Sequence, residues 1–383
     1  MRIGTILTVI LAGILVAIVG WQVYLRVNDI DLPSGETVRD VVVVDSEGNI
    51  IEPGEEADAL PRPPQAIEQE EAEKQIKADF QMTREIFVTD GVRHSVPLDE
   101  IIGGGPHRDG IPSIDNPKFI SIDEAKSWLS DEEPGIAFSA GGVDRFYPFQ
   151  ILVWHEIVND TIPVSAEASA GKGGQRILVT YCPLCLSGIV FDPVVKGERV
   201  EFGTSGKLWQ SNLVMYDRKS ETLWSQILGE AILGELTGTR LKVLPSDQVK
   251  FGNWRAEHPG GEVLSRDTGA IRFYGRDPYG DYYTTPGTFF PVAAKDNRLN
   301  DKDFVLGIVI NGKAKAYWPP AIKKQSEITD EFQDKIIIAR YEQDLDVVRL
   351  FEKKSDGTLE RVIPFGTFWF SWIAAHPDTE LLK

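Results

Sequence analysis

Short apolar runs alternate with turn-forming residues over most of this chain. The runs are rich in Val, Ile, Phe, Tyr and Trp, and Gly, Pro, Asn and Asp separate them, which is typical of β-strands joined by tight turns. The clearest case is NLVMYDRKSETLWSQ, in which residues 213–216 and 222–226 predict the two strands of a hairpin. Because side chains alternate across a strand, we expect Val214 and Tyr216 on one face and Met215 on the other.

Helical patterns are fewer than strand patterns. The best of them is SIDEAKSWL, in which Ser121 precedes Glu124 by three residues, the spacing of a capping box at the start of a helix. Together with the many strand patterns, this segment predicts a β-rich fold of the α+β class.

The N-terminal segment has a different pattern. Residues 3–25 contain no charged side chain and are mostly Ile, Leu, Val, Ala and Gly, long enough to cross the roughly 30 Å hydrocarbon core of a bilayer. The run continues through Trp21 and Tyr24, which suit the membrane interface, whereas a cleavable signal peptide normally has a shorter apolar region. We therefore predict that residues 1–27 form an uncleaved signal anchor. This single-pass transmembrane helix would place the C-terminal domain outside the cytoplasm, in the periplasm or at the cell surface.

Composition changes again after this segment. Residues 28–85 hold a β-branched run and then many Pro and Glu residues, which we interpret as an acidic stalk. The remaining length is sufficient for a sizeable core, and 42% hydrophobic and 10% aromatic residues in the chain argue against disorder. We expect a main domain over 86–300 and a second, shorter module over 301–383 packed on it.

The middle and the end of the chain resemble each other. GGVDRFYPFQIL and NWRAEHPGGEVLS in the middle correspond to NGKAKAYWPPAI and FSWIAAHPDTELLK at the end. The matched positions are Gly142, Arg145, Tyr147, Trp254, His258 and Pro259 in the first copy and Gly312, Lys315, Tyr317, Trp372, His376 and Pro377 in the second. Their common order predicts a duplicated β module. Features of both copies are expected to be architectural, whereas HEIVND and TYCPLC occur only in the first copy, where any chemistry is expected.

The charge of the chain limits its partners. The formal net charge is −18 at pH 7, which disfavours nucleic acid and anionic membrane surfaces. Metal cations and basic proteins remain compatible with it. The expected contact with a membrane is through the N-terminal helix, and a protein partner stays unidentified.

The chain has two cysteines, Cys182 and Cys185, which form a Cys-x-x-Cys pair in TYCPLCLSGIVFDP. Strand patterns precede and follow the pair at residues 177–181 and 188–191, so we expect a tight turn between strands and not the start of a helix. This context differs from the thioredoxin type of site, in which a helix N-terminus lowers the pKa of the first thiol. A disulfide across so short a loop would stabilise the fold by only about 2 kcal/mol, so stabilisation alone is a poor reason for the pair.

A turn with two thiols can present both sulfur atoms to one soft metal ion, as half of a zinc knuckle does. The other ligands would come from elsewhere in the sequence. The first candidates are His155 and Asp160, and His107 and Met215 are secondary ones. Two thiolates and a histidine suit zinc or copper, and a thioether would shift the preference toward Cu(I). Copper or zinc is therefore the expected cofactor.

Several ordered motifs resemble those of a known family. DGIPSIDNPKF, YPFQILVWHEIVND, TYCPLCLSGIVFDP, FGTSGKLWQSNLVMYDRKSETLWSQ and TFFPV are similar to segments of the bacterial and archaeal family called domain of unknown function 3179. Leu186 departs from the small residue that usually follows the second cysteine. The resemblance implies an exported or membrane-anchored protein and brings no established activity. The motif positions that it adds are Glu156, Asn159, Tyr181, Pro183, Tyr216, Asp217, Arg218 and Trp224.

Three functions are open at this point. The leading hypothesis is a membrane-anchored binding protein that holds copper or zinc through Cys182, Cys185 and a histidine. The second is an extracytoplasmic thiol-disulfide oxidoreductase, which needs a reversible and accessible disulfide. The third is a cell-surface interaction module with a structural disulfide, whose aromatic β surface binds a protein or glycan. A ring nitrogen of His155 beside both sulfur atoms would favour the first hypothesis, and an isolated buried pair would favour the third.

Overall fold

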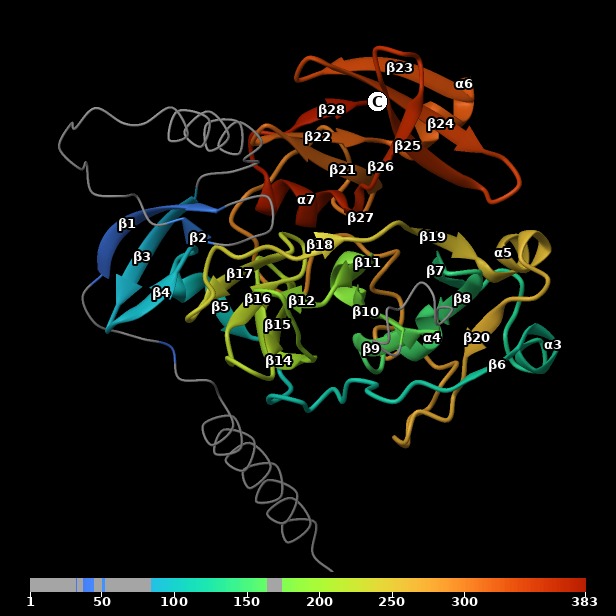
Figure 1. Ribbon diagram of the computed structural model, residues 1–383, viewed down its shortest axis with the longest axis horizontal. Coiled ribbons are helices and arrows are strands. Elements are labelled where there is room, and N and C mark those ends of the chain that lie inside the picture. Colours follow the sequence, from blue (N-terminus) through green and yellow to red (C-terminus); the bar gives the residue numbers. More distant parts are fainter. Residues whose placement is uncertain (1–31, 33–36, 45–49, 52–83, 164–173) are drawn as a thin grey trace, which may run out of the picture.

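The computed structural model describes residues 32, 37–44, 50–51, 84–163 and 174–383. The predicted signal anchor and most of the predicted stalk lie outside these ranges. Within them, no helix combines the length and the apolar character that a membrane crossing needs. The described part of the chain is β-rich, as predicted, with short helices between the strands (Figure 1).

The largest sheet has nine strands. Their order is β2 (Ile50–Ile51), β1 (Thr37–Val44), β3 (Arg84–Thr89), β4 (Val92–His94), β17 (Glu230–Leu233), β16 (Leu223–Ser225), β15 (Asn212–Asp217), β14 (Phe202–Trp209) and β5 (Ile101–Gly103). Strand β1 pairs antiparallel with β3, so part of the stretch predicted as a stalk belongs to this sheet. The predicted hairpin is formed by β15 and β16. Val214 and Tyr216 pack in one hydrophobic cluster and Met215 in another, which confirms the predicted faces.

Two pairs of sheets show the duplication. The first copy holds the sheets β19-β7-β8-β20-β6 and β18-β11-β10-β9, and the second holds β27-β21-β22-β28 and β26-β25-β24-β23. The elements of the first copy are β6 (Phe119–Ser121), β7 (Pro134–Ala140), β8 (Val143–Pro148), α4 (Phe149–Leu152), β9 (Ile157–Ile162), β10 (Gln175–Cys182), β11 (Ser187–Asp192), β18 (Lys242–Val243), β19 (Ser246–Lys250), α5 (Phe251–Glu257) and β20 (Glu262–Leu264). Those of the second are β21 (Phe304–Ile310), β22 (Lys313–Tyr317), α6 (Pro319–Gln325), β23 (Glu327–Phe332), β24 (Lys335–Glu342), β25 (Val347–Lys353), β26 (Leu359–Val362), β27 (Phe365–Phe368), α7 (Trp369–Ala375) and β28 (Glu380–Leu382).

Each copy also contains a parallel strand pair at the same place in its first sheet. β8 pairs parallel with β20, and β22 pairs parallel with β28. A helix precedes the last strand of each copy, α5 in the first and α7 in the second. Trp254 and Trp372 are fully buried in these helices and contact the rings of His258 and His376, with ring centroids 5.7 and 4.2 Å apart. The predicted architectural role of this Trp and His pattern is confirmed.

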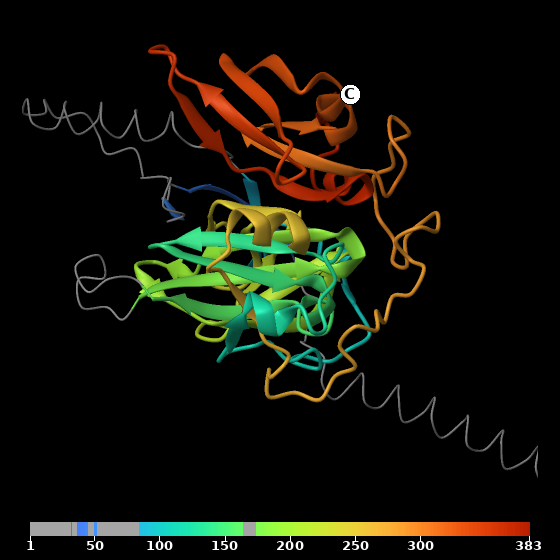
Figure 2. The ribbon, with the colours of Figure 1, turned by 90° about the vertical axis from the view of Figure 1, so that its right-hand side faces the viewer.

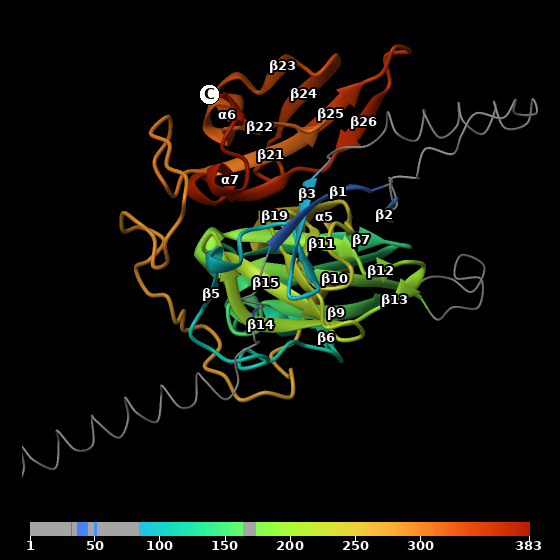
Figure 3. The same ribbon diagram turned by 90° about the vertical axis from the view of Figure 1, so that its left-hand side faces the viewer.

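Two segments distinguish the first copy. Residues 193–241 lie between β11 and β18 and supply β12 (Val194–Val195), β13 (Glu198–Arg199) and the strands β14 to β17 of the large sheet. Residues 265–303 connect the copies and contain no strand or α-helix. Figures 2 and 3 show this connecting segment along one side of the molecule.

The predicted capping box starts a very short helix. In α3 (Ile122–Ala125), Ser121 Oγ accepts a hydrogen bond from the N–H of Glu124, and the Ser121 N–H donates to the Glu124 carboxylate at 2.9 Å. The two remaining short elements are the 3-10 turns η1 (Leu98–Glu100) and η2 (Pro183–Cys185). The second of these carries Cys185, and it lies where the first copy, the large sheet and β27 share one hydrophobic cluster.

Candidate functional site

The cysteines lie on a tight turn between two paired strands, as predicted. β10 ends at Cys182, η2 follows it, and β11 begins at Ser187, which faces Cys182 in the antiparallel ladder. Leu186 closes the turn with φ at 49°. This left-handed conformation costs a residue other than glycine about 1–2 kcal/mol.

The second copy contains the same turn without thiols. Asp346 closes it with φ at 56°, and in both copies the N–H of the closing residue donates to the carbonyl three residues earlier, at 3.3 Å for Leu186 and 3.2 Å for Asp346. At the positions of the two cysteines, the second copy has Glu342 and Leu345. The backbone of the turn therefore belongs to the shared scaffold, and the thiols are an addition of the first copy.

Both thiols are buried and no disulfide joins them. Cys182 is 1% exposed and Cys185 is fully buried. Burial raises the pKa of Cys182 well above its usual range, and the hydrogen bond between the two thiol groups raises it further. Cys182 is therefore a protonated thiol at neutral pH, and it needs a proton acceptor before it can act as a nucleophile or bind a metal ion.

Three separate segments hold the turn in place. Cys185 Sγ donates to the carbonyl of Ser211 at 3.2 Å, in the turn between β14 and β15. The hydroxyl of Thr367 in β27 donates to the carbonyl of Cys185 at 3.0 Å. The hydroxyl of Tyr282, from the connecting segment, donates to the carbonyl of Leu184 at 2.9 Å. The pair therefore lies where residues 193–241, the second copy and the connecting segment meet.

A buried carboxyl group accompanies Cys182. Glu156 lies between α4 and β9 with φ at 58°, and its carbonyl accepts the N–H of Tyr181 at 2.8 Å. Ser326 has the same backbone role in the second copy, with φ at 65° and a bond of 2.8 Å to Tyr341. The Glu156 side chain is 7% exposed and has no hydrogen bond to any described residue. Burial raises its pKa to about 8, and its charge adds to the raised pKa of Cys182.

Tyrosines of the connecting segment cover the thiols. The ring centroids of Tyr279, Tyr282 and Tyr283 lie 5.8 to 6.4 Å from one another. Burial raises the pKa of Tyr279 and of Tyr282 well above the usual range; the charge of Glu156 adds to the first and the thiols add to the second. The arrangement is a closed cluster of thiols, phenols and one carboxyl group. In the sequence, the tyrosines of this cluster belong to the run YGDYY at residues 279–283, a pattern that by itself indicates only a loop.

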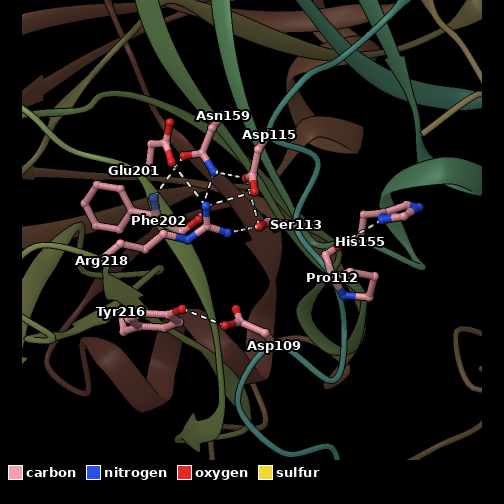
Figure 4. Close-up of polar contacts among 10 residues, drawn as sticks. All are labelled: Asp109, Pro112, Ser113, Asp115, His155, Asn159, Glu201, Phe202, Tyr216 and Arg218. Carbon is pink, nitrogen blue, oxygen red and sulfur yellow. Dashed lines mark hydrogen bonds and ion pairs between the residues drawn. The ribbon is translucent and has the colours of Figure 1, made fainter. Parts of the chain in front are cut away.

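His155 does not join this cluster. Its Nδ1 donates to the carbonyl of Pro112 at 2.7 Å (Figure 4), and its Nε2 accepts from the hydroxyl of Tyr274 at 2.6 Å. Burial lowers the pKa of His155 to about 4, so the ring is neutral near pH 7. With both nitrogens in these bonds, the expected placement of this ring beside the two sulfur atoms is not found.

Asp160 belongs to the shared scaffold. Its carboxylate accepts Arg145 Nη1 at 2.8 and 2.9 Å and the hydroxyl of Tyr147 at 2.5 Å. Asp330 has the same role in the second copy, where the matching lysine and tyrosine bond to it at 2.9 and 2.8 Å. Because the ion pair recurs in a copy that has no thiols, we reassign Asp160 from a candidate metal ligand to an architectural residue.

Arg218 and Asn159 form a polar network away from the thiols (Figure 4). Arg218 donates to Asp115 at 2.8 Å, to Glu201 at 3.1 Å and to Ser113 at 2.8 Å. Asn159 donates to the same Asp115 at 2.7 Å. These bonds attach the segment before β6 to strand β9 and to the turn that follows β15. The network is partly exposed, and its charged groups are already paired with one another.

Asp217 stabilises the turn of the β15 and β16 hairpin. It accepts the indole N–H of Trp224 at 3.0 Å and the backbone N–H groups of Lys219 and Ser220 at 3.1 and 2.6 Å. It makes no ion pair with its neighbour Arg218. Although adjacent in the sequence, Asp217 and Arg218 therefore have separate partners.

The other predicted ligands lie in two different places. Met215 is fully buried in the same hydrophobic cluster as both cysteines. His107 lies in the loop after β5, where Nδ1 donates to the carbonyl of Arg108 at 2.6 Å. Across the described ranges, no group of three or more His, Cys, Asp and Glu residues is arranged to hold a metal ion. The residues thus do not fit the predicted site of two cysteines and a histidine.

Comparison with known proteins places the chain in a family. A family model described as "Protein of unknown function (DUF3179)" matches residues 108–379, which include the cysteine turn and almost all of the second copy. No curated protein and no solved structure matches the chain significantly. The predicted resemblance is confirmed, and the chain belongs to the DUF3179 family of proteins of unknown function.

Proposed function

We propose that Cys182 and Cys185 form a reversible dithiol-disulfide redox centre and that Glu156 is its proton acceptor. The protein would then be a thiol-disulfide oxidoreductase. The observation that carries this proposal is the buried Glu156 carboxyl, which makes no hydrogen bond to a described residue and interacts electrostatically with Cys182. A carboxyl with a pKa near 8 can take up and release a proton close to neutral pH.

The distribution of side chains between the copies supports this function. The turn and the left-handed position before β9 are present in both copies, but the second copy has Glu342, Leu345 and Ser326 at the places of the two thiols and the carboxyl. All three groups of the proposed centre are thus additions to one scaffold. A structural role for the cysteines alone would not explain a buried carboxyl without a hydrogen-bonding partner beside them.

The proposed reaction is an exchange with an external disulfide. Glu156 takes the proton of Cys182, and the thiolate attacks one sulfur of the external disulfide, whose other sulfur leaves as a thiolate and is protonated. Cys185 then loses its proton and attacks the Cys182 sulfur of the mixed disulfide, and the second external thiol leaves. One external disulfide becomes two thiols while two protein thiols become one disulfide. Because the thiols are buried, the segment that carries Tyr279 and Tyr282 has to move aside first.

Redox titration of the purified full chain tests the proposal. The protein is equilibrated in glutathione buffers of defined potential, quenched with acid, alkylated and weighed by mass spectrometry. We expect a two-thiol transition that is the same in both directions, with a midpoint between about −300 and −120 mV, the range of redox-active pairs. Native protein that never forms the Cys182–Cys185 disulfide under oxidising conditions would overturn the proposal.

Substitution of the carboxyl separates its role from that of the thiols. Glu156→Gln is expected to slow oxidation at pH 7 by about 10² to 10³-fold, as loss of a general base does. Glu201→Gln is the matched control, because this carboxyl is paired with Arg218 and is partly exposed. Equal oxidation rates for wild type and Glu156→Gln would remove the carboxyl from the mechanism.

A soft metal ion held by the two thiolates is the second candidate function. Two observations favour it: both sulfur atoms lie on one turn within hydrogen-bonding reach of each other, and the Met215 thioether is in the same cluster. Among first-row metals this sulfur set suits Cu(I) best. Competition against a chromogenic Cu(I) chelator tests it. One equivalent bound by wild type and none by Cys185→Ser would support the metal site.

The predicted location remains part of the proposal. A signal anchor over residues 1–27 would place the centre outside the cytoplasm, where disulfides persist. Protease accessibility of the domain in intact cells measures this directly.

A further inference from the structure

A cavity lies beside the cysteine turn. Its volume is about 430 Å³, and Tyr181 and Leu186, the residues on either side of the turn, form part of its wall. Trp128, Phe149 and Tyr283 contribute further aromatic surface. The side chains of the two cysteines do not line it. The cavity is therefore a neighbour of the thiol cluster and not part of it.

The wall of the cavity contains one arginine, Arg266, which interacts electrostatically with Glu133 of the same wall. Arg266 lies over the ring of Trp128, with its guanidinium carbon 4.2 Å from the ring centroid, and its Nη2 donates to the side-chain oxygen of Gln150. Its Nε is buried and has no hydrogen-bond acceptor. Arg266 forms no ion pair with any described residue. A buried donor of this kind without an acceptor is costly, unless a ligand supplies one.

The charges around the cavity favour a neutral ligand. Glu133 and Asp277 also line it, and burial raises the pKa of Glu133 above its ordinary value. Two carboxyl groups disfavour an anion, although Arg266 by itself would attract one. The guanidinium in turn disfavours a cation. What remains favourable is an uncharged molecule with an acceptor oxygen for Arg266 and a flat apolar surface for the aromatic walls.

We propose that this cavity binds the ring of a neutral aromatic carbonyl compound of the quinone type, with one carbonyl oxygen accepting the Nε–H of Arg266. The ring would pack against Trp128 and Phe149. Packing of the ring would explain the aromatic walls of the cavity. The hydrogen bond would give Arg266 Nε the acceptor that it lacks. This binding site goes beyond the proposed redox function and does not depend on it, because it requires neither cysteine.

Calorimetric titration with duroquinone tests the site. All four ring carbons outside the carbonyls carry methyl groups in this probe, so it is poorly reactive toward thiols. We expect one site per chain and a Kd in the micromolar range for wild type. Arg266→Met is expected to weaken binding at least tenfold, and Arg276→Met, an exposed arginine of the same segment, is expected to bind as wild type does. Arg266→Lys, which keeps the charge and lacks the Nε donor, is expected to lose affinity as Arg266→Met does.

Each other outcome overturns the proposal. No binding by wild type at 1 mM probe, roughly the weakest binding of interest for such a site, or binding by both Arg266 variants that is as tight as binding by wild type, excludes the donor's role. Benzoate binding more tightly than duroquinone would make the site an anion site. Circular dichroism and urea unfolding identify any variant that does not fold. The double variant Cys182→Ser, Cys185→Ser is expected to bind duroquinone unchanged, so that failure of the redox centre and failure of this site are separate results.

Discussion

Replacing Glu156 by Gln removes one buried ionisable group and nearly preserves the shape of the side chain. Burial raises the pKa of Glu156 from 4.5 to about 8 in the folded protein. The folded state therefore holds this proton more tightly than the unfolded state does. The stability that depends on it is complete below pH 4.5 and is lost as the pH rises through about 8. The glutamine side chain has no proton to lose, so the variant avoids this loss.

The size of the effect follows from the two pKa values. Relative to an amide, the wild-type carboxyl costs the folded state about 2 kcal/mol at pH 6 and about 5 kcal/mol at pH 9. We therefore expect the stability advantage of Glu156→Gln to grow by about 3 kcal/mol over this interval. Any constant contribution from packing of the amide cancels in the comparison between pH values.

Urea unfolding at pH 6, 7, 8 and 9 measures this dependence. Both proteins are kept reduced, so that disulfide formation makes no contribution, and tryptophan fluorescence reports unfolding. The Glu201→Gln control should differ from wild type by no more than about 0.5 kcal/mol at every pH, as surface substitutions do. A free-energy difference between Glu156→Gln and wild type that is independent of pH would refute the buried, unpartnered state of this carboxyl.

Three further predictions concern the scaffold. Asp160→Asn breaks a buried ion pair and should lower the free energy of unfolding by about 3–5 kcal/mol, as measured in urea. Asp330→Asn should lower it less, because the side chain of Asp330 is 15% exposed and that of Asp160 only 3%. An equal or larger loss of stability for Asp330→Asn would contradict this. Because the pKa of His155 is lowered to about 4, its ring resonances in NMR should not titrate between pH 5.5 and 8. The stability that depends on the neutral ring should be lost only as the pH falls from 6.5 toward 4. Gly307→Ala should destabilise the second copy by about 1–3 kcal/mol in thermal unfolding, because a Cβ atom there would lie 2.4 Å from the ring of Trp372; an unchanged Tm would show that the ring can move away.

Several features of the fold could be predicted because they depend on local spacing. Alternation along a strand placed Val214 and Met215 on opposite faces, and the strand patterns on both sides of Cys182 placed it on a turn. The duplication was visible because each copy has a buried tryptophan and a basic residue at matching positions, Arg145 in the first copy and Lys315 in the second. In the structure, Arg145 faces Glu262 across a parallel strand pair, and the second copy repeats this pairing.

Predictions of which distant segments contact each other were less successful. Asp160 was a candidate ligand because it lies in HEIVND, yet its partner Arg145 lies on another strand and has an equivalent in the second copy. We linked His155 to the cysteines because HEIVND and TYCPLC occur in the same copy. In the structure, its partners are Pro112 and Tyr274, which come from two segments outside these motifs. Spacing along the chain cannot tell which of several polar side chains meet.

The sequence by itself determined the β-rich class, the repeated module, the turn that carries Cys182 and Cys185, and the family. These follow from periodicity, residue order and short-range turn chemistry, which act within a few residues. Only the tertiary structure decided that the thiols are buried, that Glu156 accompanies them without a hydrogen-bonding partner, and that Tyr282 covers them. The physical reason is desolvation: a pKa is raised by the removal of water, and water is removed by segments that lie far apart in the chain.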